Sequence, residues 1–329
     1  MLAQPFKLTP LVGVSIHGLF HVAEQPLANI VIATGMEEYS ARYNDFAAYL
    51  VSLGYNVTVL DHYGQGLTAS KNNLPYGIVP KDWLNKFISN LHEVILAKRR
   101  EGLPVYLLGF SMGSFVTQRY VQLHSDTIDK AVIMGSNGPD FAFKAGNILA
   151  KLTVNKHNWD KKAKLFNAMA FGTYAKSVKH PKTKVDSTLS EEEKRFNERV
   201  KELAWLSYDE ENVKTYVRAE ACGYGSTKGF YYEFMGTLHK LHSKKAMDNV
   251  RKDFPILLIA GVDDPVGHMG KGVKKLTAYY EKHGLNNVTE VIIPKMRHEI
   301  LNEADKQLVY EDIASFLATG KVKNYPSNK

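Results

Sequence analysis

The chain has 329 residues, of which 44% are apolar and 23% charged, and this composition is typical of a globular protein with one large domain or two. Its single cysteine, Cys222, excludes an intrachain disulfide and a cysteine-rich metal site. The first residues lack the pattern of a signal peptide, and no stretch approaches the roughly 18 consecutive apolar residues of a transmembrane helix. We therefore expect a cytoplasmic protein.

The net charge of +8 is concentrated in residues 141–185. This segment has one acid, Asp160, no arginine, and ten lysines: Lys144, Lys151, Lys156, Lys161, Lys162, Lys164, Lys176, Lys179, Lys182 and Lys184. Such a surface is either simply solvated or makes peripheral contact with an anionic membrane. Because no nucleic-acid-binding motif accompanies the lysines, we expect no nucleic-acid partner.

Apolar runs predict strands in chain order at residues 11–17, 18–23, 28–33, 55–60, 105–108, 128–134, 255–260 and 288–293. The first two are predicted to form an antiparallel pair. Helices are predicted over residues 39–53 and 83–100, between strands. This alternation favours an α/β fold with a mostly parallel sheet that helices cover on both faces.

Residues 139–250 break the alternation, since long lysine- and aromatic-rich helical stretches replace the strands. We predict a core formed by residues 1–138 and 251–329, with residues 139–250 inserted after the sixth strand as a helical cap. Its apolar residues either line a lipid-like channel or pack against the core, and packing is favoured for most of them. They are Phe141, Phe143, Ile148, Leu149, Leu165, Phe166, Met169 and Phe171.

The strand at residue 105 continues directly into the pattern G-x-S-x-G, with Gly109, Ser111 and Gly113. A serine in a sharp turn between a strand and a helix presents its hydroxyl as a nucleophile, and the tight turn leaves no room for side chains two residues away. The pattern predicts that Ser111 is a nucleophile, provided that a base can remove its proton.

Other strand ends carry groups that complete this chemistry, and the carboxyl ends of parallel strands meet at one edge of a sheet. His298 is the predicted base, and an aspartate, Asp263 or Asp264, is predicted to orient its ring. Charge alone does not separate the two aspartates. The backbone N–H groups of Met112 and Met36 are the predicted donors to the oxyanion.

Five motifs together resemble the α/β-hydrolases of the monoacylglycerol lipase and lysophospholipase-like group, in its bacterial form. They are residues 35–43 (GMEEYSARY), 61–66 (DHYGQG), 109–113 (GFSMG), 261–266 (GVDDPV) and 297–299 (RHE). The resemblance implies Asp264 as the acid of the triad. Two positions depart from the family pattern: Thr34 replaces a histidine, and Tyr63 replaces an arginine.

The resemblance implies hydrolysis of a carboxylic ester through an acyl-enzyme, without a metal or an organic cofactor. The expected substrate is a lysophospholipid, a monoacylglycerol or a small acyl ester. Two alternatives stay open. One is another acyl-transfer enzyme with the same triad, such as an aminopeptidase, a thioesterase or an acyltransferase; the other is a non-catalytic binding protein. A peptidase should offer an acidic group to the amino terminus of its substrate.

Overall fold

The computed structural model describes residues 3–10, 13–178, 189–243 and 245–325, and its strands form one sheet in the order β1-β2-β4-β3-β5-β6-β7-β8. β2 is antiparallel to both of its neighbours, β1 and β4, and all the other neighbouring strands are parallel. The strands are β1 (Gln4–Leu8), β2 (Ile16–His21), β3 (Ala28–Ala33), β4 (Tyr55–Leu60), β5 (Val105–Phe110), β6 (Lys130–Met134), β7 (Ile256–Gly261) and β8 (Val288–Ile293). The predicted mostly parallel sheet is confirmed.

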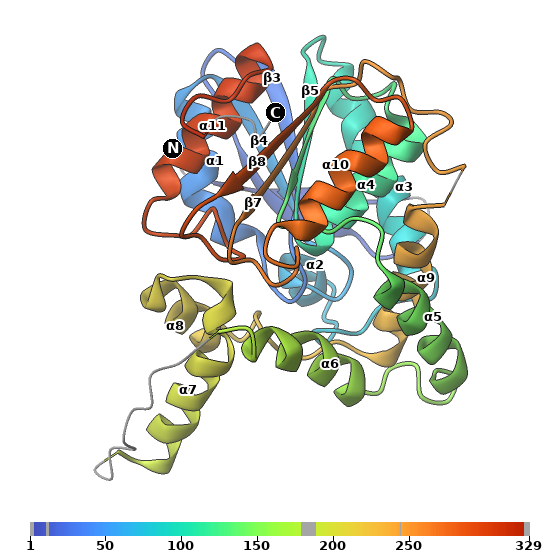
Figure 1. The fold of residues 1–329 in the computed structure, drawn as a ribbon, viewed down its shortest axis with the longest axis vertical. Coiled ribbons are helices and arrows are strands. Elements are labelled where there is room, and N and C mark those ends of the chain that lie inside the picture. Colours follow the sequence, from blue (N-terminus) through green and yellow to red (C-terminus); the bar gives the residue numbers. More distant parts are fainter. Residues whose placement is uncertain (1–2, 11–12, 179–188, 244, 326–329) are drawn as a thin grey trace.

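Helices cover both faces of this sheet, which explains why its central strands are continuous apolar runs rather than alternating ones. In β3, Ile30 and Ile32 pack into the cluster formed with α1 and α11, whereas Val31 packs into the cluster formed with α3, α4 and α10. Figure 1 shows these two helix layers on either side of the strands. The core helices are α1 (Asn44–Ser52), α2 (Gly66–Lys71), α3 (Trp83–Arg99), α4 (Met112–His124), α10 (Lys271–Lys282) and α11 (Lys306–Thr319), with the short 3₁₀ helix η1 (Ser40–Tyr43) before α1.

The opening antiparallel pair exists, but the prediction placed it wrongly. The pair consists of β1 and β2, and residues 13–15 belong to the connection between them; residues 11 and 12 lie outside the described residues. Gly18 was taken as the start of a second strand, yet it lies inside β2. A Cβ atom at Gly18 would lie 1.9 Å from the carbonyl oxygen of Val59, so the glycine permits close approach to β4 rather than a turn.

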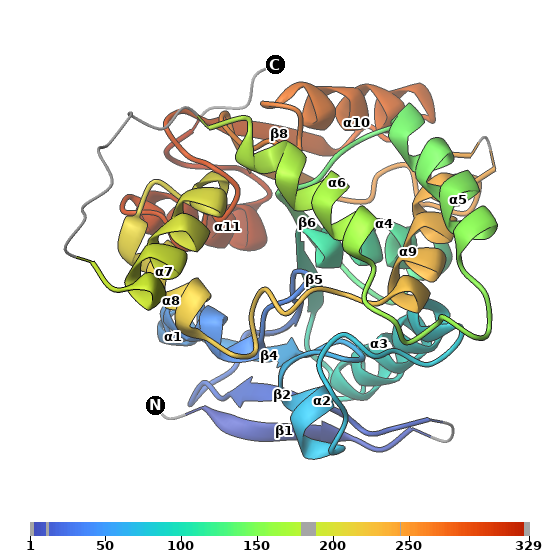
Figure 2. The same cartoon turned by 90° about the horizontal axis from the view of Figure 1, so that it is seen from below.

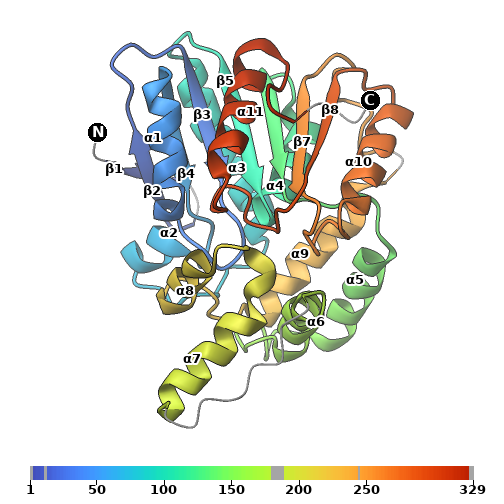
Figure 3. The same cartoon turned by 60° about the vertical axis from the view of Figure 1, so that its left-hand side comes forward.

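Among the described residues between β6 and β7 there are five α-helices, and Figures 1 and 3 show them together beyond one edge of the sheet. They are α5 (Phe141–Thr153), α6 (Lys164–Ala175), α7 (Glu191–Glu202), α8 (Glu210–Arg218) and α9 (Lys228–Leu241), with the short 3₁₀ helix η2 (Ala204–Leu206) before α8. The division of the chain into core and cap stays a prediction, and "cap" below names residues 139–250. Within the described part of the chain, no helix has the length and apolar character needed to cross a bilayer.

Candidate active site

Ser111 forms the turn between β5 and α4, with φ 52° and ψ −117°. A Cβ atom at Gly109 would lie 2.2 Å from the carbonyl oxygen of Gly113, and one at Gly113 would lie 2.0 Å from that of Ala33. Both positions therefore exclude every side chain, as the sequence predicts for this turn. The positive φ of Ser111 is unfavourable for a residue with a Cβ atom, and the packing around the turn maintains it.

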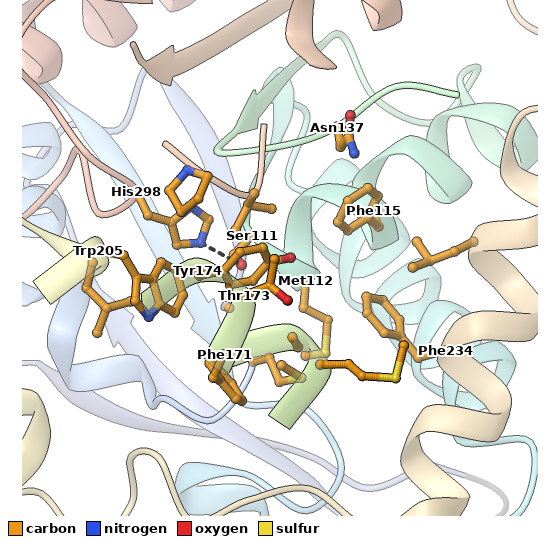
Figure 4. A pocket seen from close by; sticks show the side chains of 18 of the residues that line it. Ser111, Met112, Phe115, Asn137, Phe171, Thr173, Tyr174, Trp205, Phe234 and His298 are labelled. Carbon is orange, nitrogen blue, oxygen red and sulfur yellow. Dashed lines mark hydrogen bonds between the residues drawn. The ribbon is translucent and has the colours of Figure 1, made fainter. Parts of the chain in front are cut away.

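Ser111, His298 and Asp264 form a continuous chain of hydrogen bonds. His298 Nε2 lies 2.9 Å from Ser111 Oγ (Figure 4). His298 Nδ1 lies 2.9 Å from Asp264 Oδ1. Asp264 is fully buried and His298 is 2% exposed. An ionised carboxylate only accepts hydrogen bonds, so Nδ1 carries the proton of the neutral ring, and Nε2 is free to accept the proton of the serine hydroxyl.

The two adjacent aspartates have different partners. Asp264 Oδ1 also accepts a hydrogen bond from the backbone N–H of Val266 at 2.9 Å, which fixes the carboxylate. Asp263 points elsewhere, since its Oδ2 accepts from the hydroxyl of Tyr208 at 3.0 Å. The structure thus places Asp264, and not Asp263, beside His298.

The loops after β3 and β5 bring Met36 and Met112 to the wall of the same pocket as Ser111. Neither backbone N–H donates a hydrogen bond to any other residue that the structure describes. Unpaired N–H groups beside the serine are the geometry in which an oxyanion is stabilised.

The β3 loop is fixed by a residue of the second motif, Gln65. Its Nε2 donates to the carbonyl oxygen of Gly35 at 2.8 Å, and its Oε1 accepts from the N–H of Glu37 at 2.8 Å. Burial lowers the pKa of His62 to about 3, so its neutral ring donates from Nε2 to the carbonyl oxygen of Thr34 at 2.8 Å. These contacts support the loop where Thr34 replaces the histidine of the family pattern.

The second departure from the family pattern is also accommodated locally. Tyr63 is buried, and its hydroxyl accepts a hydrogen bond from Asn90 Nδ2 at 2.9 Å. Nearby, Asp61 accepts from the N–H of Ser40 at 2.7 Å and from that of Leu67 at 2.8 Å. Burial raises the pKa of Asp61 to about 7, and these donors oppose the shift. The motif is therefore a structural support for the loop that carries Met36.

A buried ion network, which the sequence reasoning missed, connects this loop with the histidine loop. Arg42 Nε lies 3.2 Å from Glu38 Oε2, and its Nη2 contacts Glu299, the residue after His298. Glu38 in turn accepts from the N–H of Gly35. Burial opposes the charge of Arg42, but Glu299 and Glu38 outweigh it and raise its pKa. The spacing of Glu38 and Arg42, four residues apart, was the only sequence signal, and Tyr39 between them is extended rather than helical.

We expect the substitution Arg42→Met to lower the free energy of unfolding by about 3–5 kcal/mol, because it leaves two carboxylates buried without a cation. Urea denaturation measures this loss. The matched control is Arg99→Met, which removes an exposed arginine paired with Asp129 and should cost at most about 1 kcal/mol. Equal losses in the two variants would contradict the role given to Arg42.

The serine opens into a cavity of about 380 Å³ whose walls are mainly apolar. Its lining includes three of the cap residues considered above, namely Phe143, Met169 and Phe171. Leu149 and Phe166 pack against the core. The expectation that most of the eight pack inward is wrong, because four of them are exposed: Phe141, Ile148, Leu165 and Met169. Burial therefore differs around the cap helices in a way that the sequence pattern did not reveal.

Aromatic rings surround the histidine. The centroid of Phe110 lies 4.8 Å from that of His298, and the centroid of Trp205, in η2, lies 5.3 Å from it on the cap side. Tyr174 and Phe171 of α6 contact Trp205 in turn, with centroid distances of 4.9 Å and 6.0 Å. These rings exclude water from the imidazole and confine its orientation.

Comparison with known proteins gives a family match over most of the chain, because residues 24–305 match the family described as serine aminopeptidase, S33. The chain is 26% identical to the phospholipase YtpA of Bacillus subtilis over 301 residues, which are 89% of this chain and 96% of that protein. It is 32% identical to human monoglyceride lipase over 93 residues, which are 28% of this chain and 29% of that protein.

Solved structures show the same fold. A thermostable carboxyl esterase from Bacillus coagulans, in complex with glycerol, superposes with a TM-score of 0.81 at 21% identity, covering 97% of this chain and 98% of that one. A soluble variant of monoglyceride lipase from Saccharomyces cerevisiae gives a TM-score of 0.70 at 16% identity, with coverage of 98% and 97%. Together with the family match, these findings confirm the predicted resemblance: the chain belongs to the serine aminopeptidase S33 family of α/β-hydrolases, and it is a serine ester hydrolase of the esterase and lipase type.

Proposed function

We propose that this hydrolase cleaves the carboxylic ester of a monoacyl lipid, either a monoacylglycerol or a lysophospholipid, with Ser111, His298 and Asp264 as its catalytic triad. The observation that carries the proposal is the hydrogen bond between Ser111 Oγ and His298 Nε2 at the wall of an apolar cavity. The names of two relatives, a phospholipase and a monoglyceride lipase, support a lipid ester.

In the proposed mechanism, Ser111 Oγ attacks the carbonyl carbon while His298 Nε2 takes the hydroxyl proton. The N–H groups of Met36 and Met112 stabilise the negative oxygen of the tetrahedral intermediate. When this intermediate collapses, the C–O bond to the alcohol breaks, and His298 gives its proton to the leaving oxygen. Water, activated by the same histidine, then hydrolyses the acyl-enzyme and releases the acid.

The acyl chain is assigned to the part of the cavity formed by α4, α5 and α9. Phe115, Phe143, Phe234, Met235 and Leu238 line it. Each methylene group that leaves water in such surroundings contributes about 0.8 kcal/mol, so these walls favour an acyl chain of several carbons over acetate.

The charges that line the cavity support an ester rather than a peptide substrate. Of the acids that line it, Glu38 and Glu299 are paired with Arg42, and Asp140 accepts from His268 Nε2 at 2.6 Å. None of the acidic side chains that line the described pocket is therefore left for the amino terminus of a peptide, which an aminopeptidase must bind.

Hydrolysis assays with glycerol monoesters of increasing acyl length, a lysophospholipid, an acyl thioester and an aminoacyl amide test this proposal. We expect the highest kcat/KM for one of the lipid esters, with a medium or long acyl chain. Preference for the amide or the thioester would assign the triad to the alternative reaction instead. Absence of turnover by folded protein would favour a binding role.

The outer face of the cap supports peripheral contact with an anionic membrane. Phe141 is 78% exposed and Leu152 is 80% exposed, both in α5, and Leu165 in α6 is also exposed. Lys144, Lys151 and Lys164 are exposed on the same two helices. Figure 2 shows α5 and α6 on the face of the cap turned away from the sheet. Large apolar groups beside lysines fit the boundary between acyl chains and acidic head groups.

We expect the triple reversal Lys144→Glu, Lys151→Glu and Lys164→Glu to weaken binding to vesicles of acidic phospholipid about a hundredfold or more, since each lysine near such a surface contributes about 1 kcal/mol. Cosedimentation with vesicles measures this change. The control reverses Lys271, Lys274 and Lys275, which are exposed on α10, and alters the net charge equally. Equal weakening in both variants would indicate a general charge effect and contradict a membrane-binding cap.

A further inference from the structure

The cavity extends to two sides of Ser111, and the two sides differ in chemistry. Figure 4 shows Phe115 and Phe234 on one side of the serine and Trp205 on the other, and Tyr174 packs against Trp205. On the first side the side chains from α4 and α9 are apolar, and Asn137 also lies there. The second side carries an indole N–H and a phenol hydroxyl.

Trp205 has an unusual environment for a buried indole. Its side chain lines the cavity, the residue is 3% exposed, and its Nε1 has no hydrogen-bond partner in the described part of the chain. Figure 4 shows the nitrogen on the edge of the ring that faces Phe171 rather than His298. Since buried donors are nearly always paired, an unpaired N–H on a cavity wall indicates an acceptor that arrives with the ligand.

Tyr174 adds a second unpaired donor to the lining of the same cavity. Its ring lies against Trp205 with a centroid distance of 4.9 Å, it lines the cavity, and its hydroxyl makes no hydrogen bond to a described residue. Burial raises the pKa of this phenol, so it stays protonated and can donate. An indole nitrogen can only donate, whereas a phenol can both donate and accept. Trp205 therefore needs an acceptor lone pair from the ligand, and Tyr174 can pair with either a lone pair or a hydroxyl hydrogen. A hydroxyl oxygen supplies both.

The position of these donors identifies the part of the ester that they meet. The leaving alcohol receives its proton from His298 Nε2, so this alcohol must lie next to the imidazole during the reaction. Trp205 packs on that imidazole, with a centroid distance of 5.3 Å. Trp205 and Tyr174 therefore line the part of the cavity that is nearest to the alcohol, while the side formed by α4 and α9 is left for the acyl chain.

We propose that Trp205 Nε1 and Tyr174 Oη form a subsite for the alcohol part of the substrate and select alcohols that carry oxygen close to the ester bond, as glycerol does. The proposal rests on the proposed ester hydrolase function and adds two specificity-determining residues to it. A simple alkyl alcohol leaves both donors unpaired, and this loss penalises its ester.

The test compares two esters of one acid that differ only in their hydroxyl groups, 1-hexanoylglycerol and propyl hexanoate. The quantity measured is the ratio of kcat/KM for the glyceryl ester to that for the propyl ester. We expect each of the variants Trp205→Phe and Tyr174→Phe to lower this ratio about three- to tenfold, because each removes one hydrogen bond and keeps a ring in place. The control, Trp83→Phe, changes a buried tryptophan that lies outside the cavity lining and donates to the carbonyl oxygen of Phe230, and it should leave the ratio unchanged.

A ratio that stays constant in both cavity variants overturns the proposal, even if both values of kcat/KM fall. A packing defect would lower the two values equally and leave their ratio unchanged. Calorimetric binding of the same two esters to Ser111→Ala protein gives the contrast without turnover. Equal affinities there, or no effect of Trp205→Phe on the difference, contradict the alcohol subsite. If the wild-type protein hydrolyses neither ester but still binds the glyceryl ester more tightly, the proposed hydrolysis is contradicted and the alcohol subsite is supported.

Discussion

Replacement of Ser111 by alanine is expected to reduce kcat for the preferred ester about 10⁴-fold or more, while the fold remains intact. The reason is that no other hydroxyl hydrogen-bonds to His298 Nε2 within the described residues, so the variant has no nucleophile for the acyl-enzyme. Removal of a small, half-buried hydroxyl has little effect on packing. Steady-state hydrolysis of the ester, with circular dichroism as a check of folding, measures the result.

The matched control for this experiment is Ser70→Ala, an exposed serine on α2 that is expected to keep wild-type activity. A folded Ser111→Ala protein with activity within tenfold of wild type would contradict the assignment of Ser111 as nucleophile. Such a result would indicate that a different side chain of the cavity is the nucleophile.

Replacement of Asp264 by asparagine is expected to lower kcat by up to about 10⁴-fold, whereas Asp263→Asn should stay within a few-fold of wild type. The carboxylate of Asp264 holds the proton of His298 on Nδ1, and an amide can donate as well as accept, so it permits the wrong tautomer. Asp263 instead bonds to Tyr208. The two adjacent substitutions change the charge equally, and the same ester assay measures both.

This pair of variants separates the role in the triad from a general effect of negative charge near the cavity. Equal losses in both variants would contradict the orienting role of Asp264. A larger loss in Asp263→Asn would assign the acid to the other aspartate and require a different arrangement of this loop.

Much of the fold followed from local patterns in the sequence. The runs that became β3 and β4 are buried along their whole length and β8 is mostly buried, and the predicted bounds of all three agree with the structure. The opening strands were misplaced because a glycine inside a strand resembles a turn. Only the contact between Gly18 and Val59, residues distant in the chain, explains the glycine.

The residues of the candidate site could be predicted where a short local motif contains the residue that performs one chemical role. Ser111, Asp264 and His298 each lie at the end of a strand, and the sheet topology brings strand ends together. The contacts of Arg42 with Glu299, and of Trp205 with His298, connect distant segments and leave no periodic pattern. The sequence also did not predict which apolar residues of the cap are exposed. Phe141 is exposed, but its residue type is equally compatible with a position in the core.

The most direct test of the central claim is to trap the acyl-enzyme. Protein mixed with a p-nitrophenyl acyl ester and quenched in acid is digested with trypsin, and the peptide of residues 101–119, which contains Ser111 and Ser114, is examined by mass spectrometry. We predict an increase in mass by one acyl group on Ser111, and none in Ser111→Ala protein. An acyl group on a different residue, or ester turnover with this peptide never acylated, would contradict the account.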